Sequence, residues 1–135
     1  MESLLSWPTD DGGTLTRADV VRWWESRRLR FNLYVGAVGL VTWFLVMVAG
    51  SAAVKPGVDF EEPIAMIFGP FVYGFMANLC YTLGWVVDIF EFHGAARRAA
   101  LYKRGVVFSV VLTALPGVWA VVAWLTTLIT GHKLD

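Results

Sequence analysis

Two carboxylates lie one helical turn apart at the end of a long apolar stretch, and they have the clearest potential for chemistry in this sequence. Asp88 and Glu91 follow a run that also carries Asn78, Tyr81 and Thr82. Acidic side chains inside an apolar span are costly and often mark ion paths or proton relays. These five residues are therefore candidates for a polar seam or the lining of a pore. The acids could instead form salt bridges with nearby arginines and fix the register of neighbouring helices.

Other kinds of chemical site have little support in the sequence. A single cysteine, Cys80, excludes an intramolecular disulfide and a cysteine-only metal cluster. The two histidines, His93 and His132, are too few and too far apart for a convincing metal pair. The chain also has no nucleophile motif, phosphate-binding glycine loop or zinc signature. We therefore predict no metal, no cofactor and no enzymatic activity.

The composition indicates a membrane protein with one domain. The 135 residues are 57% hydrophobic and only 16% charged, whereas soluble domains carry about 25% charged residues. The formal net charge is zero, so a large basic surface for nucleic acid is not expected. The partner that the composition predicts is the lipid bilayer.

Three apolar stretches are long enough to cross a bilayer as helices. Residues 31–54 carry no charged side chain, and at about 1.5 Å per residue they exceed the roughly 30 Å hydrocarbon layer. Residues 64–90 and 106–130 form the second and third spans, in which Pro70 and Pro116 favour kinks. The predicted fold is an all-α integral membrane protein with three transmembrane helices preceded by an amphipathic interfacial helix.

The remaining segments connect and flank these spans. Thr16, followed three residues later by Asp19, predicts the start of the interfacial helix. The predicted segments are a polar N-terminal segment (1–14), the amphipathic helix (15–30), an extracytoplasmic loop (55–63), a basic connector (91–105) and a short tail (131–135).

The basic residues favour one orientation in the membrane. Five arginines precede the first span and four basic residues follow the second, whereas the segments on the opposite side carry only Lys55 and Lys133. Cytoplasmic segments are enriched in lysine and arginine. We therefore predict a multi-pass protein of the cell membrane, such as a bacterial inner membrane, with a cytoplasmic N-terminus and an extracytoplasmic C-terminus.

Tryptophans and basic residues cluster in the two segments predicted to be cytoplasmic. Indole and guanidinium groups suit the headgroup layer, and the same groups can dock a soluble protein. The candidates for contact with the interface or with a cytoplasmic partner are Trp23, Trp24, Arg27, Arg28, Arg97, Arg98, Lys103 and Arg104.

Small residues recur at helical spacing in all three spans and predict close helix packing. The candidates are Gly36, Gly39, Gly74, Ala77, Gly84 and Ala120. One such seam can serve packing within the chain while another joins neighbouring subunits. We therefore expect a homo-oligomer.

The order of the elements is similar to that of bacterial diacylglycerol kinases, in which an amphipathic helix precedes three spans. In the stretch MANLCYTLGWVVDIFE, Asn78 matches that family's motif, but glycine or apolar residues stand where its acids should be. This departure removes the residues for phosphoryl transfer, so we assign the chain to no family.

Two functions are compatible with these features. The first is a small oligomeric pore or ion channel, or a protein that otherwise alters membrane permeability, such as a bacterial effector gated by a soluble partner. Its second span would line the central region. The alternative is a non-catalytic membrane anchor or subunit that docks a cytoplasmic protein through its tryptophan- and arginine-rich segments.

Overall fold

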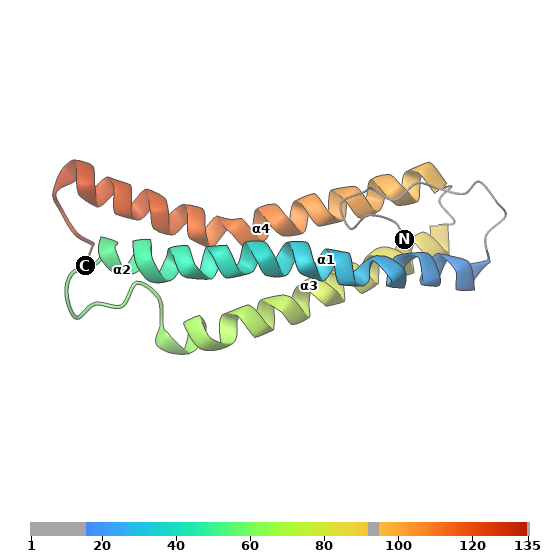
Figure 1. The fold of residues 1–135 in the computed structure, drawn as a ribbon, viewed down its shortest axis with the longest axis horizontal. Coiled ribbons are helices and arrows are strands. Elements are labelled where there is room, and N and C mark those ends of the chain that lie inside the picture. Colours follow the sequence, from blue (N-terminus) through green and yellow to red (C-terminus); the bar gives the residue numbers. More distant parts are fainter. Residues whose placement is uncertain (1–15, 92–94, 135) are drawn as a thin grey trace.

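The computed structural model describes residues 16–91 and 95–134, and nearly all of them are helical. Three long helical rods lie along one another (Figure 1). The first rod comprises α1 (Arg17–Leu45), a π-helical turn η1 (Val46–Gly50) and α2 (Ser51–Ala53). The second rod is α3 (Pro63–Glu91), and the third rod is α4 (Ala95–Thr130). Each rod is long and apolar enough to cross a membrane. The all-α prediction is confirmed for the described residues.

The predicted interfacial helix is not a separate element. The hydroxyl of Thr16 accepts a hydrogen bond from the backbone N–H of Asp19, whose carboxylate accepts one from the N–H of Thr16. From this cap the rod continues for 37 residues, Arg17 to Ala53. Its length of roughly 55 Å far exceeds the hydrocarbon layer of about 30 Å. The arginine-rich turns are therefore continuous with the first rod and do not form a helix of their own.

The basic connector is also largely helical. Its residues from Ala95 onward form the first turns of α4, so α4 likewise begins well before its apolar part. The beginnings of α1 and α4 and the end of α3 meet at one end of the molecule (Figure 1). This end, which we call the basic end, contains the arginine-rich turns of α1 and α4. The side of the membrane on which it lies stays a prediction.

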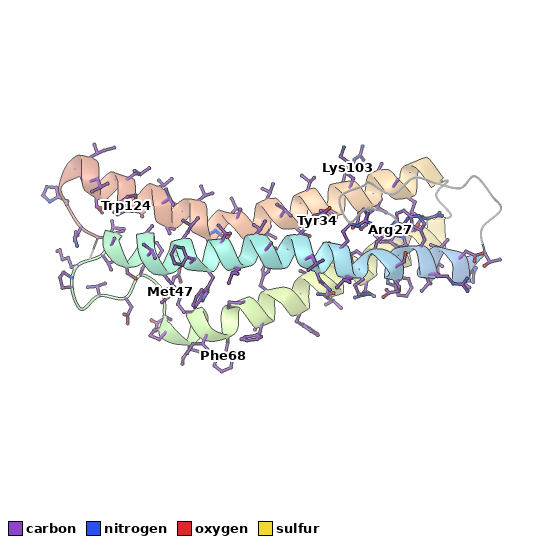
Figure 2. The ribbon with its side chains drawn as sticks, viewed as in Figure 1. Arg27, Tyr34, Met47, Phe68, Lys103 and Trp124 are labelled. Atoms are coloured by element: carbon purple, nitrogen blue, oxygen red, sulfur yellow. The ribbon has the colours of Figure 1, made fainter. Side chains whose placement is uncertain are left out.

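The interior is small, and α1 lies between the other two rods (Figure 1). The main cluster lies toward the basic end and comprises Val20, Trp24, Phe31, Val35, Ala77, Tyr81, Tyr102 and Val106. Much of the apolar surface faces outward instead: Phe71 is 75% exposed, and Phe68 projects away from the bundle (Figure 2). An apolar surface of this extent needs a covering, which a lipid bilayer would provide.

The two prolines do not end their helices, since α3 continues through Pro70 and α4 through Pro116. Pro70 has no N–H to donate to the carbonyl four residues earlier. That carbonyl belongs to Met66, and it accepts a hydrogen bond from the indole Nε1 of Trp43 at 3.0 Å. A donor from α1 thus compensates for the hydrogen bond that α3 lacks at Pro70.

The predicted packing residues differ in their surroundings. Ala77 and Ala120 are buried, and a Cβ at Gly84 would lie 3.6 Å from the Trp24 ring. A Cβ at Gly39 would likewise meet Thr113, whereas one at Gly36 or Gly74 would meet nothing within 4 Å.

One close approach of α1 and α4 occurs at Gly117, which is not among the predicted packing residues. A Cβ at Gly117 would lie only 3.2 Å from the Cα of Thr42. A backbone atom moves aside less easily than the end of a flexible side chain, so this crossing favours glycine.

The short tail closes the end opposite the basic end. The N–H of Leu134 donates to the carbonyl of Ala53 at 2.9 Å, and the N–H of Lys55 donates to the carbonyl of Leu134 at 3.1 Å. These bonds satisfy a carbonyl that the end of α2 would otherwise leave without a helical donor. No local pattern in the sequence predicts this pairing.

Candidate functional site

A buried ion pair joins the end of α3 to the beginning of α4. The Nε of Arg98 donates to Oδ2 of Asp88 at 2.6 Å, and the two side chains are 3% and 0% exposed. Burying a charge is costly unless it is paired and hydrogen-bonded. The pair therefore fixes the end of α3 relative to the beginning of α4.

The first helix joins this pair through a tryptophan. The indole Nε1 of Trp24 donates to the same oxygen of Asp88 at 2.9 Å. The hydroxyl of Tyr81, two turns earlier on α3, donates to the backbone carbonyl of Trp24. Hydrogen bonds from α1 and α4 thus converge on one carboxylate of α3. We call Trp24, Tyr81, Asp88 and Arg98, together with Tyr102, the buried cluster.

Aromatic rings fill the space around the buried ion pair. Trp24 lies edge-to-face against Tyr81 and Tyr102, with ring centroids 5.4 and 5.9 Å apart. Such edge-to-face pairs add about 0.5–1.5 kcal/mol beyond the burial of area. The neighbouring Trp23 ring has the Arg27 guanidinium 4.0 Å from its centroid. The aromatic residues selected for the headgroup layer therefore also pack within the protein.

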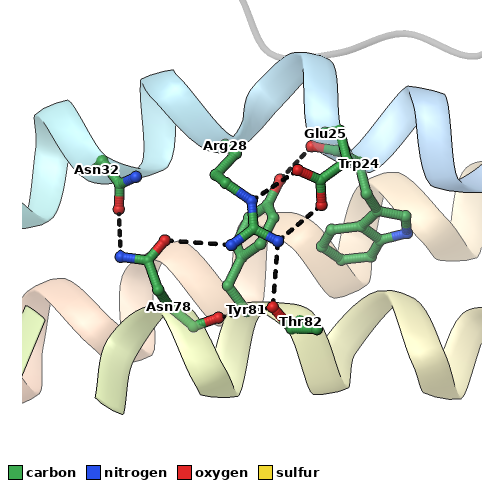
Figure 3. Close-up of polar contacts among 7 residues, drawn as sticks. All are labelled: Trp24, Glu25, Arg28, Asn32, Asn78, Tyr81 and Thr82. Atoms are coloured by element: carbon green, nitrogen blue, oxygen red, sulfur yellow. Dashed lines mark hydrogen bonds and ion pairs between the residues drawn. The ribbon is translucent and has the colours of Figure 1, made fainter. Parts of the chain in front are cut away.

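A second polar network lies between α1 and α3 (Figure 3). Arg28 makes two bonds of 2.7 Å to Glu25 and also donates to Asn78 and Thr82 at 3.3 and 3.1 Å. The amide of Asn78 in turn donates to Oδ1 of Asn32 at 2.8 Å. These side chains are half-buried or exposed, in contrast to the buried cluster. The network holds α3 against α1 beside that cluster.

A third set of polar contacts connects α3 and α4 deeper in the apolar part. The hydroxyl of Tyr73 donates to the backbone carbonyl of Ser109 at 3.1 Å, and Thr113 donates to the hydroxyl of Tyr73 at 2.8 Å. We did not select Tyr73 from the sequence. Its signal is spacing, because Tyr73, Ala77 and Tyr81 follow one another by four residues on one face of the helix.

The predicted polar seam is thus divided between two places. Tyr81 and Asp88 belong to the buried cluster, and Asn78 and Thr82 belong to the network with Arg28. All four bond to residues of the same chain. Glu91 ends α3, and its side chain lies outside what the structure describes.

The predicted interfacial and docking residues separate by exposure. Trp24 and Arg98 are buried, and Trp23, Arg27 and Arg28 are half-buried. Arg97, Lys103 and Arg104 are exposed on α4. Of these predicted residues, only the last three are exposed on the surface of the described chain.

Among the described residues, the Arg98 guanidinium and the Trp24 indole both donate hydrogen bonds to the carboxylate of Asp88. Within residues 16–91 and 95–134, no three His, Cys, Asp or Glu side chains come together as metal ligands would. No family model, curated protein or solved structure matches the chain significantly. The arrangement is that of a clamp which fixes three helix ends.

Proposed function

We propose that this chain is a non-catalytic membrane subunit whose basic end docks an acidic cytoplasmic partner. The observation that carries the proposal is the buried Asp88–Arg98 pair with its bond from Trp24. This clamp makes the charged turns of α1 and α4 part of the folded bundle. A partner would therefore meet a preformed surface and would lose less conformational entropy than it would by ordering loose loops.

Exposed cations on α4 supply the docking groups. Arg97 and Arg104 are both exposed. They are seven residues apart, so they lie two turns apart on one face of the helix. Arg22 adds an exposed cation on α1. Clustered charges of one sign steer a partner of opposite sign and fix its register.

The geometry supports docking better than the pore that the sequence also predicts. The polar side chains of α3 bond to α1 and α4, while its outward face presents Phe71, Phe75 and Leu83. A water-filled path is ordinarily lined by polar groups or backbone carbonyls, so a pore would require the polar residues to leave their partners. The pore and the homo-oligomer stay predictions.

Purification of the tagged protein from its native membranes tests the docking proposal. A stoichiometric acidic partner should be recovered with the wild type, and R97Q/R104Q should lower its affinity roughly tenfold, because each exposed cation contributes about 0.7 kcal/mol. K55Q/K133Q removes the same charge at the opposite end and should leave recovery unchanged. Equal recovery with both double variants, or no acidic partner at all, would contradict the proposal.

A further inference from the structure

An apolar groove runs between α1 and α4 in the part of the bundle that lies beyond the basic end. It has a volume of about 450 Å³, and its walls include Val38, Val41 and Leu45 of α1 and Ala114, Val118 and Val121 of α4. No residue of α3 is among the described residues that line it. The groove therefore lies on the surface that only α1 and α4 form.

Basic residues continue both walls of the groove toward the basic end. On α1, steps of four residues lead from Val38 back to Tyr34 and Arg30. On α4, steps of four, three and four residues lead from Ala114 back to Lys103. Both cations thus belong to the helix faces that line the groove.

The two cations lie at nearly the same height. The helices α1 and α4 run in the same direction (Figure 1), and Thr42 faces Gly117 where they cross. Counting back along both helices from this crossing brings Arg30 level with Lys103 within about one turn. Figure 2 shows Tyr34 between the two helices and Lys103 on α4 toward the same end.

Further polar groups lie close by at this end of the groove. Arg27 and Tyr34 are helical neighbours of Arg30 on α1, and Tyr102 precedes Lys103 on α4. Tyr102 is itself buried, whereas Arg27, Arg30 and Tyr34 are half-buried and Lys103 is exposed. Toward the basic end, the helix faces that continue the apolar walls therefore carry cations and the phenol of Tyr34.

We propose that this groove binds an anionic phospholipid of the leaflet next to the basic end. One acyl chain lies against Val38, Val41 and Val118, and the phosphate meets Arg30 and Lys103. The height from Arg30 to Leu45 is roughly 22 Å, which accommodates one leaflet of hydrocarbon, about 15 Å, together with a headgroup. Charge complementarity thus coincides with the expected depth of a lipid.

A second copy of the chain suits the groove less well. Copies inserted in one membrane with the same orientation bring their basic ends to the same height. The neighbour would therefore place a predominantly basic segment beside Arg30 and Lys103, and like charges repel. An anionic lipid supplies the opposite charge together with an apolar chain.

Native mass spectrometry of the purified protein in a neutral detergent tests the site. Dioleoyl phosphatidylglycerol should be retained in preference to dioleoyl phosphatidylcholine. Each cation near an anionic lipid changes affinity roughly fivefold, so R30Q/K103Q should weaken retention of phosphatidylglycerol by about twenty-fivefold. A114F, which fills the groove and leaves every charge in place, should also reduce it. Glycerol phosphate has no acyl chain and should not compete.

The matched control is K55Q/K133Q, which removes two cations at the end opposite the basic end and should retain the lipid. Equal loss with both double variants would overturn the proposal, because it would indicate a general attraction to anionic lipid. Competition by glycerol phosphate would identify a site for free anions instead. A dimer that A114F abolishes without any change in lipid retention would identify a second copy as the occupant. The site uses neither Arg97 nor Arg104, so its failure would leave the docking proposal intact.

Discussion

Arg98→Met should destabilise the bundle by about 3 kcal/mol or more. Removing one member of a buried ion pair typically costs about 3–5 kcal/mol, because the other charge stays buried without its partner. Asp88 is 0% exposed, so water cannot reach it without a local opening. The bond from Trp24 at 2.9 Å remains, which favours the lower part of that range. Methionine keeps the unbranched shape of the arginine stem and limits any cavity.

A double variant separates the charge effect from the loss of packing. D88N/R98M removes both charges and keeps an oxygen that can accept from Trp24. Replacing a whole buried pair by uncharged groups is often close to neutral, so we expect a cost within about 1.5 kcal/mol of the wild type. The two single substitutions should then be strongly non-additive, with a coupling energy of about 2 kcal/mol or more.

Unfolding by sodium dodecyl sulfate in mixed micelles, followed by far-UV circular dichroism, measures these free energies. The matched control is Arg97→Met, one residue earlier on α4. Arg97 is exposed, so its substitution should change stability by less than about 0.5 kcal/mol. Equal effects of the two methionine variants, or an additive cycle with Asp88→Asn, would refute a buried clamp at this position.

Two further substitutions test the packing between the rods in the same unfolding assay. Gly117→Leu should lower the free energy of unfolding by about 1–3 kcal/mol, because it forces α4 away from the backbone of Thr42. The control Gly36→Leu places its side chain in open space and should change that free energy by less than about 0.5 kcal/mol. Equal effects would mean that α1 and α4 do not cross at Gly117. Trp43→Phe removes the donor to the Met66 carbonyl and should cost about 0.6–1.7 kcal/mol. No change in stability would mean that another donor satisfies that carbonyl.

The three rods could be predicted because their signals are local. Long uncharged runs and the Thr16–Asp19 cap depend only on neighbouring residues. The separate interfacial helix was a different kind of inference. Tryptophan and arginine on one helix suit a lipid headgroup layer, but they also suit the end of a bundle where Trp24 can meet Asp88. Their pattern alone does not distinguish these two surroundings.

The partners within the site depend on how the helices pack. From the sequence, burial of Asp88 in an apolar span is expected to cost free energy, and nearby arginines are possible partners for it. Arg97 and Arg98 are neighbours, however, and their side chains point in different directions on a helix. The rotation of α4 against α1 decides which of them is buried, and that rotation is set by contacts such as Gly117 with Thr42. The bonds of Leu134 to Ala53 and Lys55 are equally long-range. No local sequence pattern predicts these long-range bonds.

In the docking proposal, the polar face of α3 stays closed against α1 and α4 and lines no aqueous path. Reaction of single cysteines with a charged, water-soluble methanethiosulfonate tests it, after exposed Cys80 has been replaced by serine. Ala77→Cys changes a buried residue of that face very little, and Arg104→Cys serves as the exposed reference. We predict rapid reaction at position 104 and essentially none at position 77. Comparable rates at the two positions would contradict the closed bundle and favour a pore.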